Sequence, residues 1–446
     1  MKDIYEDYRK KLISADEAAR FVKFGDKIFY SEFLLFPEVL DEALSRRIHV
    51  LKDIDLRSVC FSRVPKIVEA DPDRQHVVMN DWQFGTVSRR LHDRNLCNYI
   101  PLCYHQGPRT IRKYSHFDVA FIAVAEMDKN GYFNYGLANS LTGAALSKSK
   151  IVILEVNQSI PYCYGGNRES VHISKVDYIV EGNHSPLPEV KPVPPGNVDR
   201  RIAEHIMKEI EDASCLQFGI GGLPNLIGQM IAESDLKDLG IHTEVLVDSC
   251  VDLYDAGKIT GKRKSVDPFK MAYTAAMGTK KLYDFIDHNP TCVSYPVSYI
   301  NDPRIIARNS NVVAINHAFE VDLFGQVCSE SVGTDEKSGT GGQLDYLLGA
   351  FMSKGGKGIV YLHSTHKDKD GKRCSRIVPS IDPGSIVTVP RSIVQYVATE
   401  YGIVQLGGKS TWERADALIS IAHPDFRDEL IGRAHKMKIW VKGNRH

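Results

Sequence analysis

The sequence has neither a long apolar run nor a net charge, and each absence excludes a class of function. No uncharged apolar stretch approaches the length of about 18 residues that a membrane-spanning helix needs. Among its 446 residues, 56 are basic and 56 are acidic, so no overall positive charge points to nucleic acid or an anionic membrane. An anionic ligand would therefore depend on local groups.

Patterned cysteines and metal-ligand spacings are also missing. The nine cysteines include no Cys-x-x-Cys pair, which fits reduced thiols in a cytoplasm. The charged N-terminal segment MKDIYEDYRKK lacks the apolar core of a signal peptide. His363 and His366 are three positions apart, but no carboxylate or cysteine cluster accompanies them, so we expect no metal site. The sequence predicts a cytoplasmic protein with neither a nucleic-acid nor a membrane partner.

Strand-like and helix-like segments alternate along the chain, which predicts an α/β protein. Ser14 and Glu17 form a capping box, so a helix is expected to begin near Ala15. Pro37 is expected at the first position of a later helix. Several strand-like segments are uninterrupted apolar runs, as expected for strands covered on both faces; they include DVAFIAVAEM, KIVILEVN, TEVLVDS, VVAINHAF and SIVTV.

A proline-rich segment and an internal repeat predict two domains. The segment 186–200 is the expected linker, between an N-terminal domain of residues 1–185 and a C-terminal domain of residues 201–446. The pattern Glu-x-Asp-x-x-Gly follows an apolar strand in each half, at 126–131 and at 320–325. This repeat predicts two similar folds, and clefts between such halves are common ligand sites.

Two glycine-rich loops are candidates for ligand binding. The first contains Gly219, Gly221 and Gly222 and leads into a helix with Pro224 near its start, so its N–H groups suit an anion. A dinucleotide-binding turn and a plain tight turn are the alternatives, although the third spaced glycine of a dinucleotide fingerprint is missing. The second loop, SGTGGQLDY, precedes a helix from about Gln343 and suits an oxyanion or a pantetheine amide, or is a structural turn.

Glu244 lies in an unusual setting, the segment LGIHTEVLVDSC, which has the pattern of a buried strand. Glu is rare in such strands unless it is paired, so a surface-facing or a salt-bridged glutamate is the alternative. Loops at the carboxyl ends of parallel strands meet at one crevice, which predicts that Glu244 lies near the first glycine loop. His242, on the same strand face, is expected to be a packed histidine rather than an acid–base group.

Two further segments carry positive charge. Arg391 and Ser392 are expected where a strand ends and a helix begins, an arrangement that suits a phosphate. An exposed arginine without a ligand is the alternative. The lysine-rich segment 366–373 is expected to be a solvated turn.

Five motifs in order resemble the acetyl-CoA hydrolase/transferase family of class I CoA-transferases: GIGGLP, GIHTE, EVDLFGQVCSES, SGTGGQLDY and AHPDFRDEL. The 4-hydroxybutyrate and butyryl-CoA:acetate branches are the most similar. The resemblance implies two similar open α/β domains with the active site in the cleft between them, and it implies that Glu244 is a nucleophile. It also implies CoA contacts at Gly219, Ile220, Gly221, Gly222, Leu223, Phe319, Gly341, Gly342 and Arg391.

The same resemblance implies transfer of CoA from acetyl-, butyryl- or 4-hydroxybutyryl-CoA to a short-chain carboxylate such as acetate or 4-hydroxybutyrate. The expected route is ping-pong chemistry through a glutamyl–CoA thioester. The CoA thioester is a substrate, no permanently bound cofactor is expected, and a homodimer or homotetramer is implied. Thioester hydrolysis at the same site and a non-catalytic or sugar-phosphate-binding α/β protein remain the alternatives.

Three positions depart from the family pattern. Ala125 and Glu126 stand where relatives often carry Ser-Pro, in a region expected to be remote from Glu244. Ser249 replaces a common glycine and is expected to tighten the turn that follows. Cys328 stands where some acetate-transferring relatives carry an oxyanion-holding asparagine, so the oxyanion here would depend more on backbone N–H groups.

Overall fold

The structure is a computed structural model that describes residues 4–191 and 193–439. It divides into two α/β units, so the predicted α/β class is confirmed. The units are not continuous halves of the chain. Unit 1 holds the described residues within 1–191, 244–247 and 272–300, and unit 2 holds those within 192–243, 248–271 and 301–446. The segments 244–247 and 272–300, which the sequence placed in the C-terminal domain, therefore belong to unit 1.

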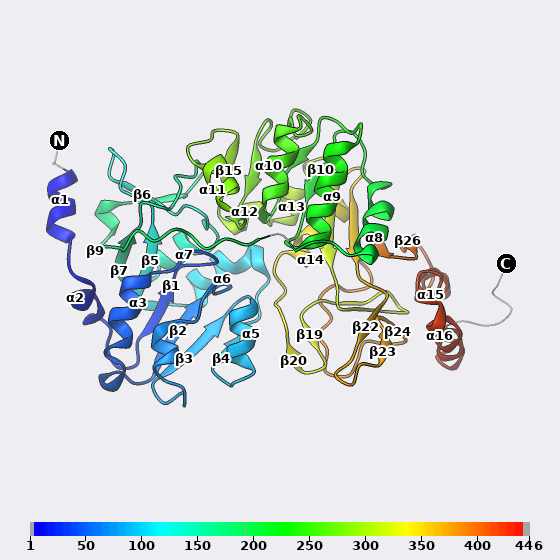
Figure 1. Cartoon of the computed structure of the whole chain (residues 1–446), viewed down its shortest axis with the longest axis horizontal. Helices are drawn as coiled ribbons and strands as arrows, with labels where there is room; N and C mark the ends of the chain where they lie inside the picture. Colours follow the sequence, from blue (N-terminus) through cyan, green and yellow to red (C-terminus); the bar gives the residue numbers. More distant parts are fainter. Residues whose placement is uncertain (1–3, 192, 440–446) are drawn as a thin grey trace. The chain divides into compact units, whose positions relative to one another are not determined.

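Unit 1 is built on a seven-stranded parallel sheet with the order β4-β3-β2-β1-β5-β7-β9 (Figure 1). The order reverses at the junction of β1 and β5, which is the topological switch point where open α/β sheets place their ligands. The strands are β1 (Lys27–Tyr30), β2 (Ile54–Ser58), β3 (Val77–Asp81), β4 (Cys97–Tyr99), β5 (Phe117–Val124), β7 (Ser149–Val156) and β9 (Tyr178–Glu181).

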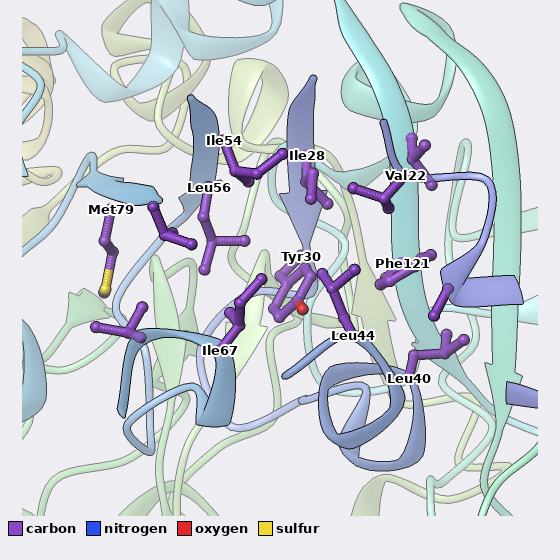
Figure 2. Close-up of a cluster of buried hydrophobic side chains, with 14 of the residues drawn as sticks. Val22, Ile28, Tyr30, Leu40, Leu44, Ile54, Leu56, Ile67, Met79 and Phe121 are labelled. Carbon is purple, nitrogen blue, oxygen red and sulfur yellow. The ribbon is translucent and has the colours of Figure 1, made fainter. Parts of the chain in front are cut away.

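Helices cover the sheet of unit 1, and apolar side chains fill the space between. Figure 2 shows Leu40 and Leu44 of α3 (Glu38–Ser45) beside Tyr30 of β1 and Phe121 of β5, and all four are 0% exposed. Burying a side chain of this size stabilises the fold by about 1.5–3 kcal/mol. The core therefore fixes β1 and β5, and with them the switch point.

The capping prediction for the N-terminal helix is confirmed, because Ser14 and Glu17 form a capping box at α2 (Ala15–Ala19). Pro37 was predicted at the first position of α3, but it is the N-cap residue, one position earlier. The other helices of unit 1 are α1 (Ile4–Lys11), α4 (Lys66–Glu69), α5 (Thr86–His92), α6 (Gly107–Tyr114), α7 (Thr142–Leu146), α11 (Lys280–Ile286) and α12 (Val297–Ile300).

Backbone pairing explains why residues 244–247 belong to unit 1. The short strand β12 (Val245–Leu246) pairs in parallel with β14 (Ala275–Ala276). Ala276 N–H donates to Leu137 O at 2.8 Å, and Ala275 forms an antiparallel bridge to Ala138. Two more short pairs complete the strands, β6 (Tyr132–Asn134) with β8 (Ser170–His172) and β13 (Met271–Tyr273) with β15 (Cys292–Ser294).

The first part of the proline-rich segment packs on unit 1. Val190 N–H donates to Gly278 O at 2.8 Å, and Tyr283 Oη donates to Pro188 O at 2.7 Å. Of the residues described between β9 and α8 (Asn197–Met207), none lies in a regular helix or strand. Hydrogen bonds therefore fix the first part of this segment on unit 1, and its end, from Asn197, is already part of α8.

Unit 2 is built on a six-stranded sheet with the order β11-β10-β16-β21-β25-β26, in which all pairs are parallel except β25–β26. Its switch point is the junction of β10 and β16. The strands are β10 (Cys215–Gln217), β11 (Gly240–Ile241), β16 (Val312–His317), β21 (Lys357–Tyr361), β25 (Tyr396–Thr399) and β26 (Gly402–Gln405).

Further helices and short strands complete unit 2. The helices after α8 are α9 (Gly222–Glu233), α10 (Asp248–Asp255), α13 (Pro303–Ile306), α14 (Gln343–Met352), α15 (Thr411–Ser420) and α16 (Pro424–Lys436). Short pairs are β17 (Glu320–Asp322) with β18 (Val327–Cys328) and β24 (Ile377–Val378), β19 (Ser331–Val332) with β20 (Asp335–Glu336), and β22 (Thr365–Lys367) with β23 (Arg373–Ser375). No described helix is long and apolar enough to cross a membrane.

The repeated Glu-x-Asp-x-x-Gly pattern forms the same turn in both units. Asp128 accepts hydrogen bonds from the N–H groups two and four residues ahead, and Asp322 does the same. The glycine in each turn has a positive φ, 85° at Gly131 and 86° at Gly325, and a positive φ favours glycine. A third copy at Asp368 and Gly371 forms the turn of the lysine-rich segment, so the predicted turn there is confirmed.

Candidate active site

Glu244 lies at a bend between β11 and β12, so its predicted position inside a continuous strand is wrong. The chain leaves the sheet of unit 2 after β11 and pairs with β14 of unit 1, which forces the backbone to turn at this residue. The Glu244 carbonyl accepts hydrogen bonds from the N–H groups of Thr274 and Ala275, both at 3.1 Å. Its side chain is half-buried. The bend therefore holds a carboxylate with its backbone fixed and its side chain partly open.

The residue before Glu244 is bonded to the first glycine loop. Thr243 is 1% exposed, and its hydroxyl donates to Phe218 O at 3.3 Å. Phe218 directly precedes Gly219, so Glu244 follows a residue that contacts the base of this loop. That the Glu244 side chain itself lies near the loop stays a prediction. His242 is 2% exposed beside Tyr346, with ring centroids 6.4 Å apart, which fits the packed histidine that was expected.

The first glycine loop follows β10 at the switch point of unit 2 and ends where α9 begins at Gly222. Gly221 has a φ of 136°, which an L side chain rarely adopts. A Cβ at Gly222 would lie 2.9 Å from Val193 O, so this glycine permits close packing. Gly219 differs, because its φ is ordinary and a Cβ there would meet no atom within 4 Å. The fold accounts for two of the glycines but not for Gly219.

The second glycine loop contacts the neighbouring strand of the same sheet. Gly341 has a φ of 50°, and α14 begins at Gln343 as predicted. The Gln343 side-chain amide donates to His317 O at 3.2 Å, at the carboxyl end of β16. Because β16 pairs with β10, both glycine loops lie at the carboxyl edge of the unit 2 sheet. This edge offers backbone N–H groups from two loops.

The backbone of Phe319 is largely occupied within unit 2. Its N–H donates to Cys328 O at 2.9 Å, and its carbonyl accepts from the Arg376 guanidinium at 2.9 Å. A carbonyl has two lone pairs, so one remains for a ligand. The implied CoA contact at Phe319 would therefore use that lone pair or the half-buried ring.

Arg391 does not precede a helix, so the predicted helix start is wrong. Residues 391–393 form a turn that leads into β25, because Tyr396, Val397 and Thr399 suit the strand that pairs with β21. The Arg391 side chain is exposed, with its guanidinium carbon 5.6 Å from the Phe324 ring centroid. What remains of the predicted phosphate contact is an exposed cation that precedes no helix, and its backbone carbonyl accepts a hydrogen bond at 2.7 Å from Arg414, near the start of α15.

Sequence patterns missed the unit 1 groups near Glu244. Burial raises the pKa of Tyr104 far above its usual value, and the charges of Glu32 and Glu244 raise it further. Burial also raises the pKa of the Cys60 thiol to about 12, with Asp81 and Glu244 adding to the effect. Cys60 follows β2, and Tyr104 is 5% exposed. A glutamate inside the apolar segment YSEFLLF was the available signal for Glu32.

The three departures from the family pattern have different surroundings. Ser249 lies in the first turn of α10 rather than in a loop, and a Cβ at Gly228 of α9 would lie 2.7 Å from its Cβ. Its effect is therefore on helix packing. Cys328 is buried, with its sulfur 3.2 Å from Ser331 O.

A cavity of about 1010 Å³ in unit 1 includes Ala125 and Glu126 in its wall. The aromatic side chains of Tyr162 and His288 stack there, with ring centroids 5.0 Å apart. Neither Glu244 nor Glu32 is among the residues that line it. The size of a cavity alone does not indicate a reaction, so Glu244 and its surroundings stay the candidate site.

Comparison with known proteins identifies the family. The acetyl-CoA hydrolase/transferase N-terminal domain matches residues 1–191, and the acetyl-CoA hydrolase/transferase C-terminal domain matches residues 278–434. The butyryl-CoA:acetate CoA-transferase of Anaerostipes caccae is 46% identical over 442 residues, 99% of each chain. The chain belongs to the acetyl-CoA hydrolase/transferase family. The resemblance inferred from the five motifs is therefore confirmed.

Other members of the acetyl-CoA hydrolase/transferase family agree along nearly the whole chain. The 4-hydroxybutyrate coenzyme A transferase of Clostridium kluyveri is 39% identical, covering 97% of this chain and 99% of the relative. The crystal structure of RipA from Yersinia pestis superposes with a TM-score of 0.89 at 35% identity, covering 98% of this chain and 100% of the other. The acetyl-CoA hydrolase of Candida albicans is more distant, at 27% identity over 71% of this chain and 65% of the relative.

Proposed function

We propose that the protein transfers coenzyme A from an acyl-CoA to a short-chain carboxylic acid, with Glu244 as the nucleophile. The prediction of a CoA-transferase-type enzyme is confirmed by relatives that are 46% and 39% identical and are named as CoA-transferases. The observation that carries the proposed role of Glu244 is its position, half-buried at a fixed bend and directly after a residue bonded to the first glycine loop.

The chemistry balances without ATP or a metal. A Glu244 carboxylate oxygen attacks the thioester carbonyl, and CoA leaves as a thiolate, which gives an acyl–glutamyl anhydride. The thiolate then attacks the glutamyl carbonyl, so the first carboxylate leaves and a glutamyl–CoA thioester forms. An incoming carboxylate reverses these two steps and regenerates Glu244. Ping-pong kinetics follow, because the first product leaves before the acceptor reacts.

The carboxyl edge of the unit 2 sheet is the proposed binding region for the CoA thioester. Backbone N–H groups of residues 219–223 and of Gly341 and Gly342 would stabilise the developing oxyanions and hold the pantetheine amides. Phe319 and Arg391 would supply a carbonyl or ring contact and a cation for the nucleotide phosphates. Gly219 supports this assignment, because nothing in the fold requires a glycine there, whereas a closely approaching ligand does.

Replacement of Gly219 by alanine tests this region. We expect the KM for acyl-CoA to rise about tenfold, equivalent to roughly 1.4 kcal/mol of lost binding, because a methyl group would occupy ligand space. We expect the free energy of unfolding to change by less than about 0.5 kcal/mol, since the methyl group meets no protein atom within 4 Å. Initial-rate kinetics and urea denaturation measure the two quantities.

Gly432→Ala is the matched control, because a Cβ at Gly432 of α16 also meets no atom within 4 Å. Its KM should equal that of the wild type. An unchanged KM in Gly219→Ala would contradict the assignment of this loop to CoA.

A trapping experiment separates transfer from hydrolysis. The protein is incubated with acetyl-CoA without an acceptor, reduced with borohydride, and its peptides are mapped by mass. A reduced Glu244 that depends on acetyl-CoA supports the thioester route. Consumption of acetyl-CoA with an unmodified Glu244 would instead favour a hydrolase that uses this carboxylate as a base. If no acyl-CoA in a panel is consumed and none modifies Glu244, both the transferase and the hydrolase proposals are refuted.

The substrates, assembly and compartment remain part of the proposal. Acetyl-, butyryl- and 4-hydroxybutyryl-CoA are the proposed donors, with acetate and 4-hydroxybutyrate as acceptors, since the relatives' names combine these acids. We propose a cytoplasmic homodimer or homotetramer with no permanently bound cofactor. Light scattering measures the assembly, and ping-pong initial-rate patterns with each donor–acceptor pair identify the preferred acids.

A further inference from the structure

Glu32 is a buried carboxyl at the switch point of unit 1. It follows β1 by two residues and is 0% exposed. Ser31, beside it, spans the junction of β1 and β5, because its N–H donates to Phe121 O at 3.2 Å and its hydroxyl accepts from Ala123 N–H at 2.7 Å. Glu32 therefore lies at the edge of the sheet where open α/β folds place their ligands.

One oxygen of the Glu32 carboxyl has hydrogen-bond partners and the other has none within the described residues. Oε1 accepts hydrogen bonds from Leu141 N–H at 3.0 Å and from the Thr142 hydroxyl at 2.9 Å. Oε2 is buried and has no hydrogen-bond partner within the described part of the chain. A buried polar atom without a partner is costly, so Oε2 favours either a proton or a ligand. Burial raises the pKa of Glu32 to about 7, although the hydroxyls of Ser140 and Thr142 and the N–H of Leu141 oppose that rise.

One short loop connects Glu32 to the backbone of Glu244. Leu141 and Thr142 bind the Glu32 carboxyl, and Asn139 N–H donates to Thr274 O at 3.1 Å. Thr274 N–H in turn donates to Glu244 O at 3.1 Å. The loop 139–142 therefore fixes both carboxyl-bearing segments within unit 1.

The titratable groups around Glu32 also couple it to Glu244. Tyr104 Oη lies 2.6 Å from Ser140 Oγ, and the charges of Glu32 and Glu244 both act on this tyrosine. The further titratable or charged groups that interact with this set are Cys60 after β2, Asp81 at the end of β3 and Arg89 of α5. Apart from the cation Arg89, these groups are neutral or anionic, so an ionised Glu32 would add repulsion for an additional anion at this place, whereas a neutral Glu32 would not.

We propose that Glu32, in its protonated form, binds the carboxylate of the acceptor acid by donating a hydrogen bond from Oε2. This inference rests on the proposed CoA transfer, in which a carboxylate must approach close to a glutamate that carries CoA. A neutral carboxyl group donates to that anion, whereas an ionised Glu32 would repel it. Glu32 thereby gives the site its affinity for carboxylate acceptors, and this affinity depends on one proton.

The pH dependence of acceptor use tests the proposal. From about pH 5.5 to about pH 9 acetate stays ionised, so a change in its use reports on the enzyme. For the wild type we expect kcat/KM for acetate to fall about tenfold for each pH unit above about 7, mainly through a rising KM. In Glu32→Gln we expect a flat profile, because an amide N–H replaces the carboxyl O–H at every pH. The rate of thioester formation from acetyl-CoA should follow the same pH profile in each protein, because acetate leaves by the reverse of the route by which it enters.

Glu155→Gln is the matched control. Burial also raises the pKa of Glu155 to about 7, and this residue is 3% exposed, but its carboxylate accepts from Val39 and Leu40 N–H at the start of α3. This variant should keep the position of the wild-type profile even if it is less stable. A Glu32→Gln profile that matches the wild type would overturn the proposal.

A second variant covers the case in which Glu32→Gln fails to fold. The Ser140 hydroxyl lowers the pKa of Glu32, so Ser140→Ala should move the fall in kcat/KM to higher pH. An unshifted profile would overturn the proposal. Absence of the borohydride-trapped adduct from the wild type would refute the CoA-transfer route itself, whereas a trapped adduct with unshifted profiles refutes the role of Glu32 alone.

Discussion

Replacing Glu244 by glutamine should lower kcat for CoA transfer by on the order of 10⁴–10⁶, the scale seen when a covalent nucleophile is removed from another enzyme. An amide cannot form the acyl–glutamyl anhydride, so the borohydride-trapped adduct should also disappear. Binding of acyl-CoA should persist, because the proposed contacts to CoA come from the two glycine loops. Steady-state assays, peptide mass mapping and calorimetric titration with acetyl-CoA measure these three properties.

Glu126→Gln is the matched control for this prediction. Glu126 is exposed and also belongs to unit 1, but it lines the separate cavity near Tyr162. We expect its kcat and its trapped adduct to equal those of the wild type. A Glu244→Gln protein that retained more than about one hundredth of the wild-type kcat would exclude the covalent route, because removal of a nucleophile costs far more than this.

Replacing Phe121 by alanine should destabilise the protein by about 3–5 kcal/mol, the usual range when a buried phenylalanine is truncated. Phe121 is 0% exposed in the middle of β5, and its ring lies 5.8 Å from that of Tyr30. The truncation leaves a cavity between the sheet and α3 that rigid neighbours fill only in part. Urea denaturation followed by circular dichroism measures the free energy of unfolding.

The matched control for Phe121→Ala is Phe24→Ala, because Phe24 is 67% exposed. We expect this surface substitution to change the free energy of unfolding by less than about 0.5 kcal/mol. Similar losses in both variants would mean that the apolar cluster shown in Figure 2 does not determine stability.

The parts of the fold that local patterns determine could be predicted from the sequence. The capping box at Ser14, the helix from Gln343 and the paired Asp-x-x-Gly turns each depend on residues a few positions apart. The bend at Glu244 could not be predicted in this way, because it depends on pairing with Ala275, about thirty residues later. For the same reason the continuous strand expected there was wrong.

The candidate site was predictable to a similar extent. Glycines and an unusual glutamate are visible in the sequence, so Gly221 and Glu244 could be named as candidates from such signals. Glu32 and Tyr104 were not predicted, because what distinguishes them is burial and a shared loop, and residues 139–142 are more than one hundred positions from Glu32. The helix expected after Arg391 failed because pairing with β21 overrode a helix-like pattern.

The interleaving of the two units along the chain has a consequence for synthesis. Proteins with several domains usually fold from the N-terminus as each domain leaves the ribosome. Unit 1 cannot finish in this way after Lys191, because residues 244–247 and 272–300 are also part of it. Translation must therefore reach Ala276 before the strand pair that anchors Glu244 can form, and Ile300 before unit 1 is complete, and by then part of unit 2 has also emerged. A gene truncated near residue 191 would encode most of unit 1 without Glu244.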